Sequence, residues 1–179
     1  MMVATAFVLL MQLGFALIET GSVRFKNSQN ILIKNLFDAC NGALAFWLVG
    51  FGWAYGREKE GGFIGTDGRM FASSDFDRLE KNYYLLWIFQ YSFAATSATI
   101  VSGSLAERTQ IPAYLAFSTF MTGFIYPVVV GWCWGGGWLG ANGMGFQDFA
   151  GTGIVHMVGG VSGFIGAAIV GPRHGKEKD

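Results

Sequence analysis

Five long apolar stretches, separated by polar segments, dominate the hydropathy pattern of the chain. They cover about residues 1–21, 36–55, 83–106, 111–130 and 149–170. Each is close to the ~20 residues that an α-helix needs to cross the hydrocarbon core of a bilayer. None shows the strict alternation of apolar and polar residues that is typical of the strands of a membrane barrel. The pattern therefore predicts an all-α membrane protein with five transmembrane helices.

Composition agrees with this class. Hydrophobic residues make up 52% of the 179 residues and charged residues only 13%, whereas soluble domains carry roughly 25% charged residues. The formal net charge is zero, so no basic face indicates a nucleic-acid partner. Cys40 and Cys133 lie far apart, without the spacing of a metal or redox site. We therefore expect no metal and no cofactor.

Basic residues between the apolar stretches predict the orientation. Seven fall on one side of the membrane, namely Arg24, Lys26, Lys34, Arg108, Arg173, Lys176 and Lys178. Five fall on the other side, diluted by six acidic residues, namely Arg57, Lys59, Arg69, Arg78 and Lys81. By the positive-inside rule, the N-terminus is expected outside and the C-terminus in the cytoplasm. The first stretch is not a typical signal peptide, because basic residues follow it and none precedes it.

Five spans place the two ends of the chain on opposite sides of the membrane. An odd number of spans is what one unit of an inverted-repeat transporter requires, because the next unit then starts upside down. We expect residues 1–171 to form one such repeat and residues 172–179 to begin a cytoplasmic linker toward a second half. The alternative is a complete protein of five spans.

The last apolar stretch contains a histidine, in the segment DFAGTGIVHMVGGVSGFIGAAIVG. An ionisable ring is costly inside a bilayer, so His156 is a candidate functional residue. The alternative is a core histidine satisfied by a neighbouring helix. Asp148 lies eight residues upstream, about 12 Å away along a regular helix. A direct bond between the two side chains is therefore expected only if the chain turns between them.

Aromatic residues form a second candidate constellation. Phe89 and Phe93 are four residues apart and share one helix face, and Trp134 is followed directly by three glycines. Irregular backbone at membrane depth is tolerated where it is buried or lines a wet cavity. Together the rings could form a cage for a small cation, which each ring attracts by roughly 0.5–2 kcal/mol. The alternatives are packing or lipid contact for the phenylalanines and an interfacial belt for the tryptophan.

Four stretches together are similar to a known family. They are MQLGFALIETGSVRFKN, FQYSFAATSATIVSGSLAER, WCWGGGWL and DFAGTGIVHMVGG. They resemble signature stretches of the ammonium transporter (Amt) branch of the Amt/Rh family, in the same order and on the expected spans. The resemblance extends over nearly the whole chain. It implies an inverted-repeat ammonium transporter fold of which this chain is the N-terminal half, and assembly as a homotrimer with one pore per subunit.

The resemblance also implies roles for individual residues. Phe89 and Trp134 would line an outer recruitment site for the ammonium ion, and Phe93 would be one of two rings gating the pore below it. His156 would be the first of two pore histidines. Asp148 would support the recruitment site through backbone contacts, without touching the ion.

The implied function is transport rather than enzymatic catalysis. An ammonium ion would be recruited outside and deprotonated, and ammonia would pass through the hydrophobic pore of a plasma-membrane protein. Methylammonium is an alternative substrate, and the lipid bilayer and further copies of the chain are the expected partners. The second gate ring and second pore histidine have no counterpart here, since His174 falls in the predicted tail. An ammonium sensor, a regulatory subunit and a non-conducting fragment therefore stay open.

Two further features are expected to be structural. Glu19 lies close in sequence to Arg24 and Lys26, which favours a local ion pair at the end of the first span. Gly159 and Gly163 form a small-xxx-small pair in the last span, which favours close contact with another helix or between subunits.

Overall fold

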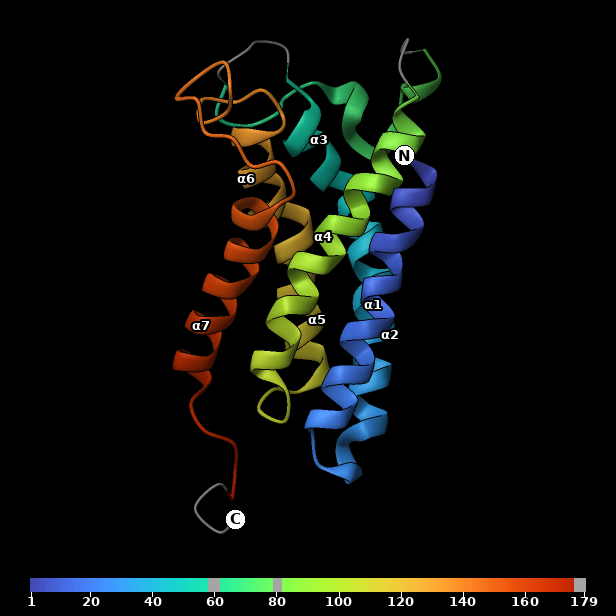
Figure 1. Ribbon diagram of the computed structural model, residues 1–179. Helices are drawn as coiled ribbons and strands as arrows, with labels where there is room; N and C mark the ends of the chain where they lie inside the picture. The colour runs from blue at the N-terminus through green and yellow to red at the C-terminus, as the bar shows by residue number, and fades with distance from the viewer. Residues whose placement is uncertain (58–61, 79–81, 176–179) are drawn as a thin grey trace.

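The computed structural model describes residues 1–57, 62–78 and 82–175, and within these ranges the chain forms helices and no strand (Figure 1). Among the described residues, five helical segments are long and apolar enough to cross a membrane. They confirm the predicted all-α membrane fold. The first and third are the unbroken helices α1 (Met2–Ser22) and α4 (Tyr83–Leu105).

The other three spans are continuous helical segments with a locally widened turn. The second comprises η1 (Phe25–Asn27), α2 (Ser28–Ala45), η2 (Phe46–Gly50) and α3 (Phe51–Tyr55). The fourth comprises α5 (Ile111–Phe120), η5 (Met121–Ile125) and α6 (Tyr126–Cys133). The fifth comprises η6 (Thr152–Met157) and α7 (Val158–Val170). Two short turns, η3 (Gly68–Ser73) and η4 (Phe76–Arg78), lie between the second and third spans.

The second span begins earlier than its hydropathy predicts. Its main helix starts at Ser28, eight residues before the predicted residue 36. Lys34 therefore belongs to this helix and is only 5% exposed, so its assignment to a cytoplasmic loop was wrong. The remaining basic residues on the predicted cytoplasmic side number six, against five on the other. The helix can include Lys34 and Asn35 because their side chains donate hydrogen bonds to Ser102 on α4 and Glu19 on α1.

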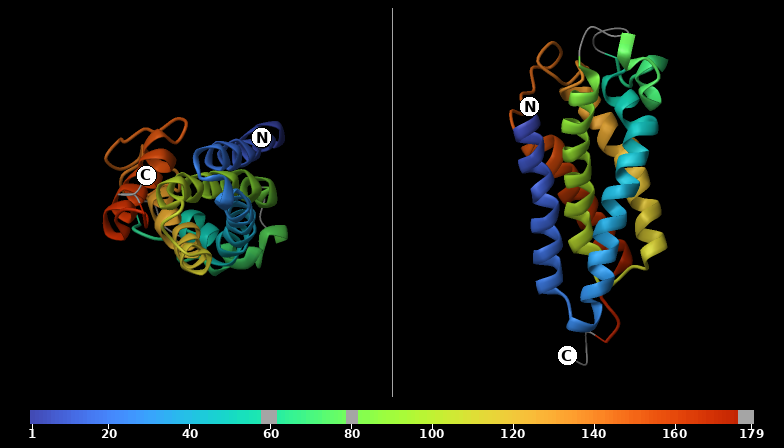
Figure 2. Two further views of the ribbon diagram at one scale, coloured as in Figure 1. Left: turned by 90° about the horizontal axis from the view of Figure 1, so that it is seen from below. Right: turned by 90° about the vertical axis from the view of Figure 1, so that its right-hand side faces the viewer.

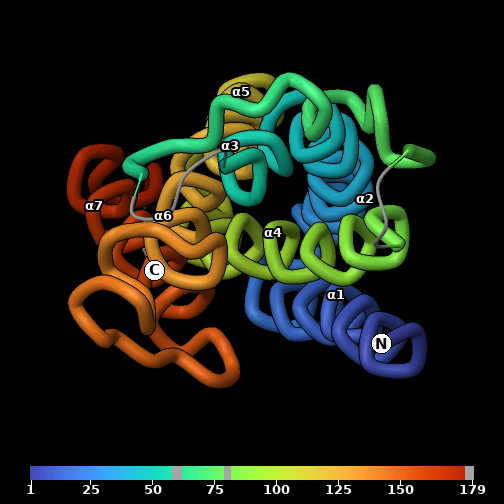
Figure 3. The backbone as a smooth tube through the Cα atoms, turned by 90° about the horizontal axis from the view of Figure 1, so that it is seen from above, coloured from blue at the N-terminus to red at the C-terminus, as the bar shows by residue number. Residues whose placement is uncertain are grey.

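Helix α4 lies in the middle of the bundle, between α1 and α7 on its two sides (Figures 2 and 3). It also packs against α2. Small residues make this central position possible, because they let helix backbones approach closely. Ala94, Ala98 and Ser102 are fully buried along it. The two ends of the chain lie at opposite ends of the bundle (Figure 1).

Glycines on α7 allow it to pack directly on α4. A Cβ atom at Gly159 would lie 2.9 Å from both the Ser97 carbonyl oxygen and the Ile100 Cβ. A Cβ atom at Gly163 would collide with the Ser104 Oγ. Real Cβ atoms do not approach so closely, so this contact requires glycine. Of the two uses expected for the small-xxx-small pair, the structure assigns it to a contact between helices of one chain.

Candidate functional site

The outer part of the candidate site is built around the carboxylate of Asp148, just before η6. Its Oδ1 accepts backbone hydrogen bonds from Gly151 at 2.8 Å and Thr152 at 3.0 Å. Its Oδ2 accepts from Gly153 and Ile154, both at 2.8 Å. The first turn of a helix has no internal acceptors for its N–H groups, and its dipole favours a negative charge. Asp148 supplies both the acceptors and the charge.

The chain can wrap around this carboxylate because Gly151 has φ of +88°, a conformation that glycine adopts without steric cost. Burial alone would raise the pKa of the Asp148 carboxyl. The backbone hydrogen bonds, that from Ile154 first, overcome burial and hold the pKa below its ordinary value. Asp148 is therefore an ionised anchor with four backbone partners.

Asp148 also fixes the orientation of Trp134. The indole Nε1 of Trp134 donates a hydrogen bond of 2.7 Å to the backbone oxygen of Asp148. Trp134 directly follows α6, so this bond ties the end of the fourth span to the start of the fifth. The tryptophan is thus held by the protein, which an indole anchored only at a lipid interface would not be.

The three predicted aromatic residues lie together in space. Phe93 is central: its ring centroid is 5.0 Å from that of Phe89 and 5.8 Å from that of Trp134. The ring planes meet at 82° and 64° respectively. Edge-to-face contacts of this kind are favourable because the positive ring edge meets a negative ring face. All three side chains are partly exposed, so the cluster has open faces.

His156 lies on η6, five residues after Gly151. Its Nδ1 is 3.1 Å from the Gly151 carbonyl oxygen. A carbonyl can only accept, so this hydrogen bond requires a proton on Nδ1, and Nε2 can accept whenever it carries no proton itself. The side chain is exposed on the surface of the described residues. His156 therefore presents one acceptor nitrogen on an otherwise apolar helix.

Asp148 and His156 do not act on one another in this geometry. The carboxylate is bonded to four backbone N–H groups, and the ring is bonded to the Gly151 carbonyl. The hydrogen bonds given for these two residues therefore do not join their side chains to one another. In the part of the chain that the structure describes, no three His, Cys, Asp or Glu side chains are grouped to hold a metal ion.

Sequence reasoning missed a buried polar cluster between α1, α2, α4 and α5. Glu19 interacts with Lys34, Asn35 and Ser102 instead of the expected Arg24 or Lys26. Asp38, 3% exposed, accepts hydrogen bonds from three hydroxyl groups, those of Thr99, Tyr114 and Ser118. The i, i+4 spacing of Lys34 and Asp38 next to an apolar run was the signal that could have revealed this cluster.

A second charged cluster joins the segments at the predicted cytoplasmic end. Glu107 accepts from the backbone and side chain of Arg24, each at 3.0 Å, and from Asn27 and Arg173, each at 2.6 Å. Burial opposes the charge, yet these hydrogen bonds lower the pKa of Glu107 to about 2. Arg24 therefore pairs with the end of the third span and not with Glu19.

Comparison with known proteins agrees with the resemblance drawn from the motifs. The model of the Ammonium Transporter Family matches residues 1–179. The chain is 47% identical over 176 residues to "Ammonium transporter 1 member 3" of Solanum lycopersicum, covering 94% of this chain and 37% of that protein. It is 43% identical over 177 residues to "Ammonium transporter Amt2" of Archaeoglobus fulgidus, a match that covers 94% of this chain and 37% of that protein.

A solved structure named "Sensor Amt Protein" has a TM-score of 0.88 and 38% sequence identity. The match covers 96% of this chain and 43% of that one. The chain thus spans less than half the length of these relatives. The family match and the five apolar helices identify a multi-pass membrane protein. The predicted family is confirmed: the chain belongs to the Ammonium Transporter Family.

Proposed function

We propose that this protein moves ammonium across the membrane, with the ion recruited at Phe89 and Trp134. The observation that carries the proposal is the fixed aromatic cluster: the Trp134 indole is hydrogen-bonded to Asp148, and the Trp134 ring contacts Phe93. Aromatic faces attract a desolvated ammonium ion, by roughly 0.5–2 kcal/mol per ring. Relatives named as ammonium transporters support the choice of substrate.

Beyond the cluster the proposed path follows the start of the largely apolar fifth span, which is unfavourable for a bare ion. Moving an unpaired charge into such surroundings costs far more than a few contacts return. Transfer of the ammonium proton to water at the partly exposed outer site would remove this cost, and neutral ammonia would then pass Phe93 as a gate. The Nε2 of His156 would accept a hydrogen bond from the passing molecule. The proposed function is transport, in keeping with relatives named as ammonium transporters.

The proposal extends to the assembly. The described bundle leaves the apolar residues of α7 exposed, among them Phe164 at 76% and Ile169 at 79%. Exposed apolar helix faces of this kind are covered by lipid or by further helices. We propose a plasma-membrane homotrimer in which a second, inverted repeat completes each pore. The N-terminus would lie outside and residues 172–179 would begin the cytoplasmic linker.

The test is uptake of methylammonium and ammonium in cells that lack transporters of their own, using the complete natural protein. We expect His156→Ala to impair conduction and Phe93→Ala to change its gating. Trp134→Leu should weaken recruitment by about 2- to 30-fold, which corresponds to the loss of one cation–ring contact. Phe120→Ala is the matched control, because this ring is 56% exposed on α5. Unchanged uptake with both His156→Ala and Phe93→Ala would refute the site assignment.

A sensor is the second candidate function, because the "Sensor Amt Protein" matches at a TM-score of 0.88. A sensor would bind ammonium at the same aromatic cluster and transmit the occupancy to the cytoplasmic face. The two functions differ in flux. Ammonium binding without uptake by the complete protein would favour the sensor, whereas saturable uptake would favour the transporter.

A further inference from the structure

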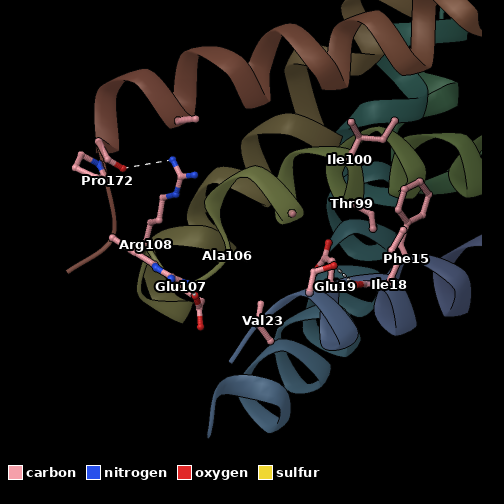
Figure 4. Close-up of a pocket in the computed structure, with 15 residues that line it drawn as sticks. Phe15, Ile18, Glu19, Val23, Thr99, Ile100, Ala106, Glu107, Arg108 and Pro172 are labelled. Atoms are coloured by element: carbon pink, nitrogen blue, oxygen red, sulfur yellow. Dashed lines mark hydrogen bonds and ion pairs between the residues drawn. The ribbon is translucent and has the colours of Figure 1, made fainter. Parts of the chain in front are cut away.

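A cavity of about 850 Å³ lies between α1, α4 and the end of α7, away from the aromatic cluster (Figure 4). Glu19 on α1 and Thr99 on α4 line one side of it, and Arg108 and Pro172 line the opposite side. None of the residues proposed above for recruitment, gating or conduction lines this cavity. On the predicted orientation, it lies in the cytoplasmic half of the membrane.

The carboxylate of Glu19 is satisfied on one oxygen only. Its Oε2 accepts from Ser102 at 2.8 Å and from Asn35 at 3.0 Å, and it lies 3.7 Å from the Lys34 Nζ. Its Oε1 is buried and has no hydrogen-bond partner. Among the buried polar atoms without a partner in the described ranges, this is the one that belongs to a residue lining the cavity. A lone buried carboxylate oxygen is costly unless a donor reaches it.

Gly103 lies beside this oxygen. A Cβ atom at Gly103 would stand 3.8 Å from Oε1, and both Gly103 and Glu19 line the cavity. The absence of a side chain at Gly103 therefore leaves Oε1 without a methyl group against it on this side. The last torsion of a glutamate side chain is broad, so the carboxylate can adjust to a ligand in the cavity.

Hydrogen-bond donors are unevenly shared within the buried cluster. Asp38 accepts from three hydroxyl groups, whereas the Oε1 of Glu19 accepts from none. A buried charge is stabilised when it is paired and hydrogen-bonded. A small monovalent cation that carries N–H donors supplies both.

We propose that Glu19 Oε1 and the adjoining cavity form an inner binding site for the ammonium ion, distinct from the outer aromatic site. The choice of ligand rests on the proposed function. Glu107 also lines the cavity, but both of its oxygens are bonded, one of them to Arg173. Occupancy of the site should therefore depend on Glu19, whose Oε1 is without a partner.

The experiment is infrared difference spectroscopy of the complete protein in lipid, recorded as ammonium replaces K⁺ at constant pH and ionic strength. K⁺ has the same charge as ammonium but no N–H donors. We expect a shift in a carboxylate stretching band that disappears in Glu19→Gln. Because Glu19→Gln leaves the Lys34 ammonium buried without its partner, the double variant Glu19→Gln/Lys34→Met is measured beside it.

Gly103→Ala keeps every charge and places a methyl group against Oε1, so the ammonium concentration for half-maximal shift should rise several-fold. Gly14→Ala is the matched control, because nothing lies within 4 Å of a Cβ at that α1 position. The same band shift with Na⁺, a shift to a protonated carboxylic acid, or a band that persists in both Glu19→Gln variants would overturn the inner site.

The outcomes for the two sites are separable. Trp134→Leu should weaken uptake but leave the band of Glu19 responsive to ammonium. Uptake without any band dependent on Glu19 would remove the inner site and leave the transport proposal standing. A Glu19 band that responds to ammonium in a protein without uptake would keep the inner site and refute the transport proposal.

Discussion

Asp148 and Glu107 stand near opposite ends of the helix formed by η6 and α7, and several hydrogen bonds hold each carboxylate ionised. Asp148 binds four backbone N–H groups within six residues of itself. Glu107 instead binds Arg24, Asn27 and Arg173, which lie 66 to 83 residues away along the chain. One anchor shapes a local turn and the other joins distant segments.

The two carboxylates therefore have different structural roles. Backbone donors are present whatever the side chains are, so the turn at Asp148 depends on one residue and on the positive φ of Gly151. Side-chain donors can be removed one at a time, so the junction at Glu107 should weaken in steps. Glu19 differs from both, because one of its oxygens has no partner. The two satisfied carboxylates are structural, and the incompletely satisfied one is the candidate for a ligand.

Asp148→Ala should have the largest effect. Loss of a capping acceptor costs up to about 2 kcal/mol, and here four N–H groups lose their acceptor together. We expect the thermal unfolding midpoint of the purified protein to fall and ammonium uptake to be abolished, because Trp134 is held by the same turn. Asp148→Asn retains one acceptor oxygen and should lose less stability. Equal midpoints for Asp148→Ala and the wild type would show that the turn does not depend on this residue.

The overall fold could be predicted from the sequence because membrane spans are defined by hydropathy alone. Four of the five predicted spans begin within three residues of the observed helices. The start of the second span was predicted too late because Lys34 and Asn35 make its first turns resemble a loop. Their partners lie on α1 and α4, and a tertiary arrangement of this kind cannot be predicted from one segment.

The candidate site was predictable to a similar extent. The four-residue spacing of Phe89 and Phe93 placed both rings on one face, and the structure brings them together with Trp134. Sequence proximity was misleading for Glu19, whose expected partner Arg24 instead binds Glu107. Ion pairs form between side chains that are close in space, whatever their separation in sequence. The turn after α1 directs the Arg24 side chain toward the end of α4.

Glu107→Gln tests the second carboxylate and should lower the stability of the protein to an intermediate extent. Hydrogen bonds to a charged group contribute about 1.5–3 kcal/mol, and the amide keeps the shape but loses the charge. The folded-state pKa of about 2 lies below the ordinary value of 4.5. The stabilisation is therefore complete above about pH 4.5 and is lost as the pH falls toward 2. Unfolding midpoints recorded across this range should converge for Glu107→Gln and the wild type at the acid end.

Arg173→Met should have the smallest effect and completes the comparison. It removes one of the donors to Glu107 and leaves Arg24 and Asn27 in place. Partly exposed ion pairs contribute about 0–1 kcal/mol and are screened by salt, and the Arg173 side chain is 31% exposed. The midpoint should therefore fall slightly at low salt and less at high salt. Arg78→Met is the control, since its pair with Asp75 is 84% exposed on the arginine side and lies outside the junction. A loss as large as that of Glu107→Gln would mean that the junction is cooperative and does not weaken in steps.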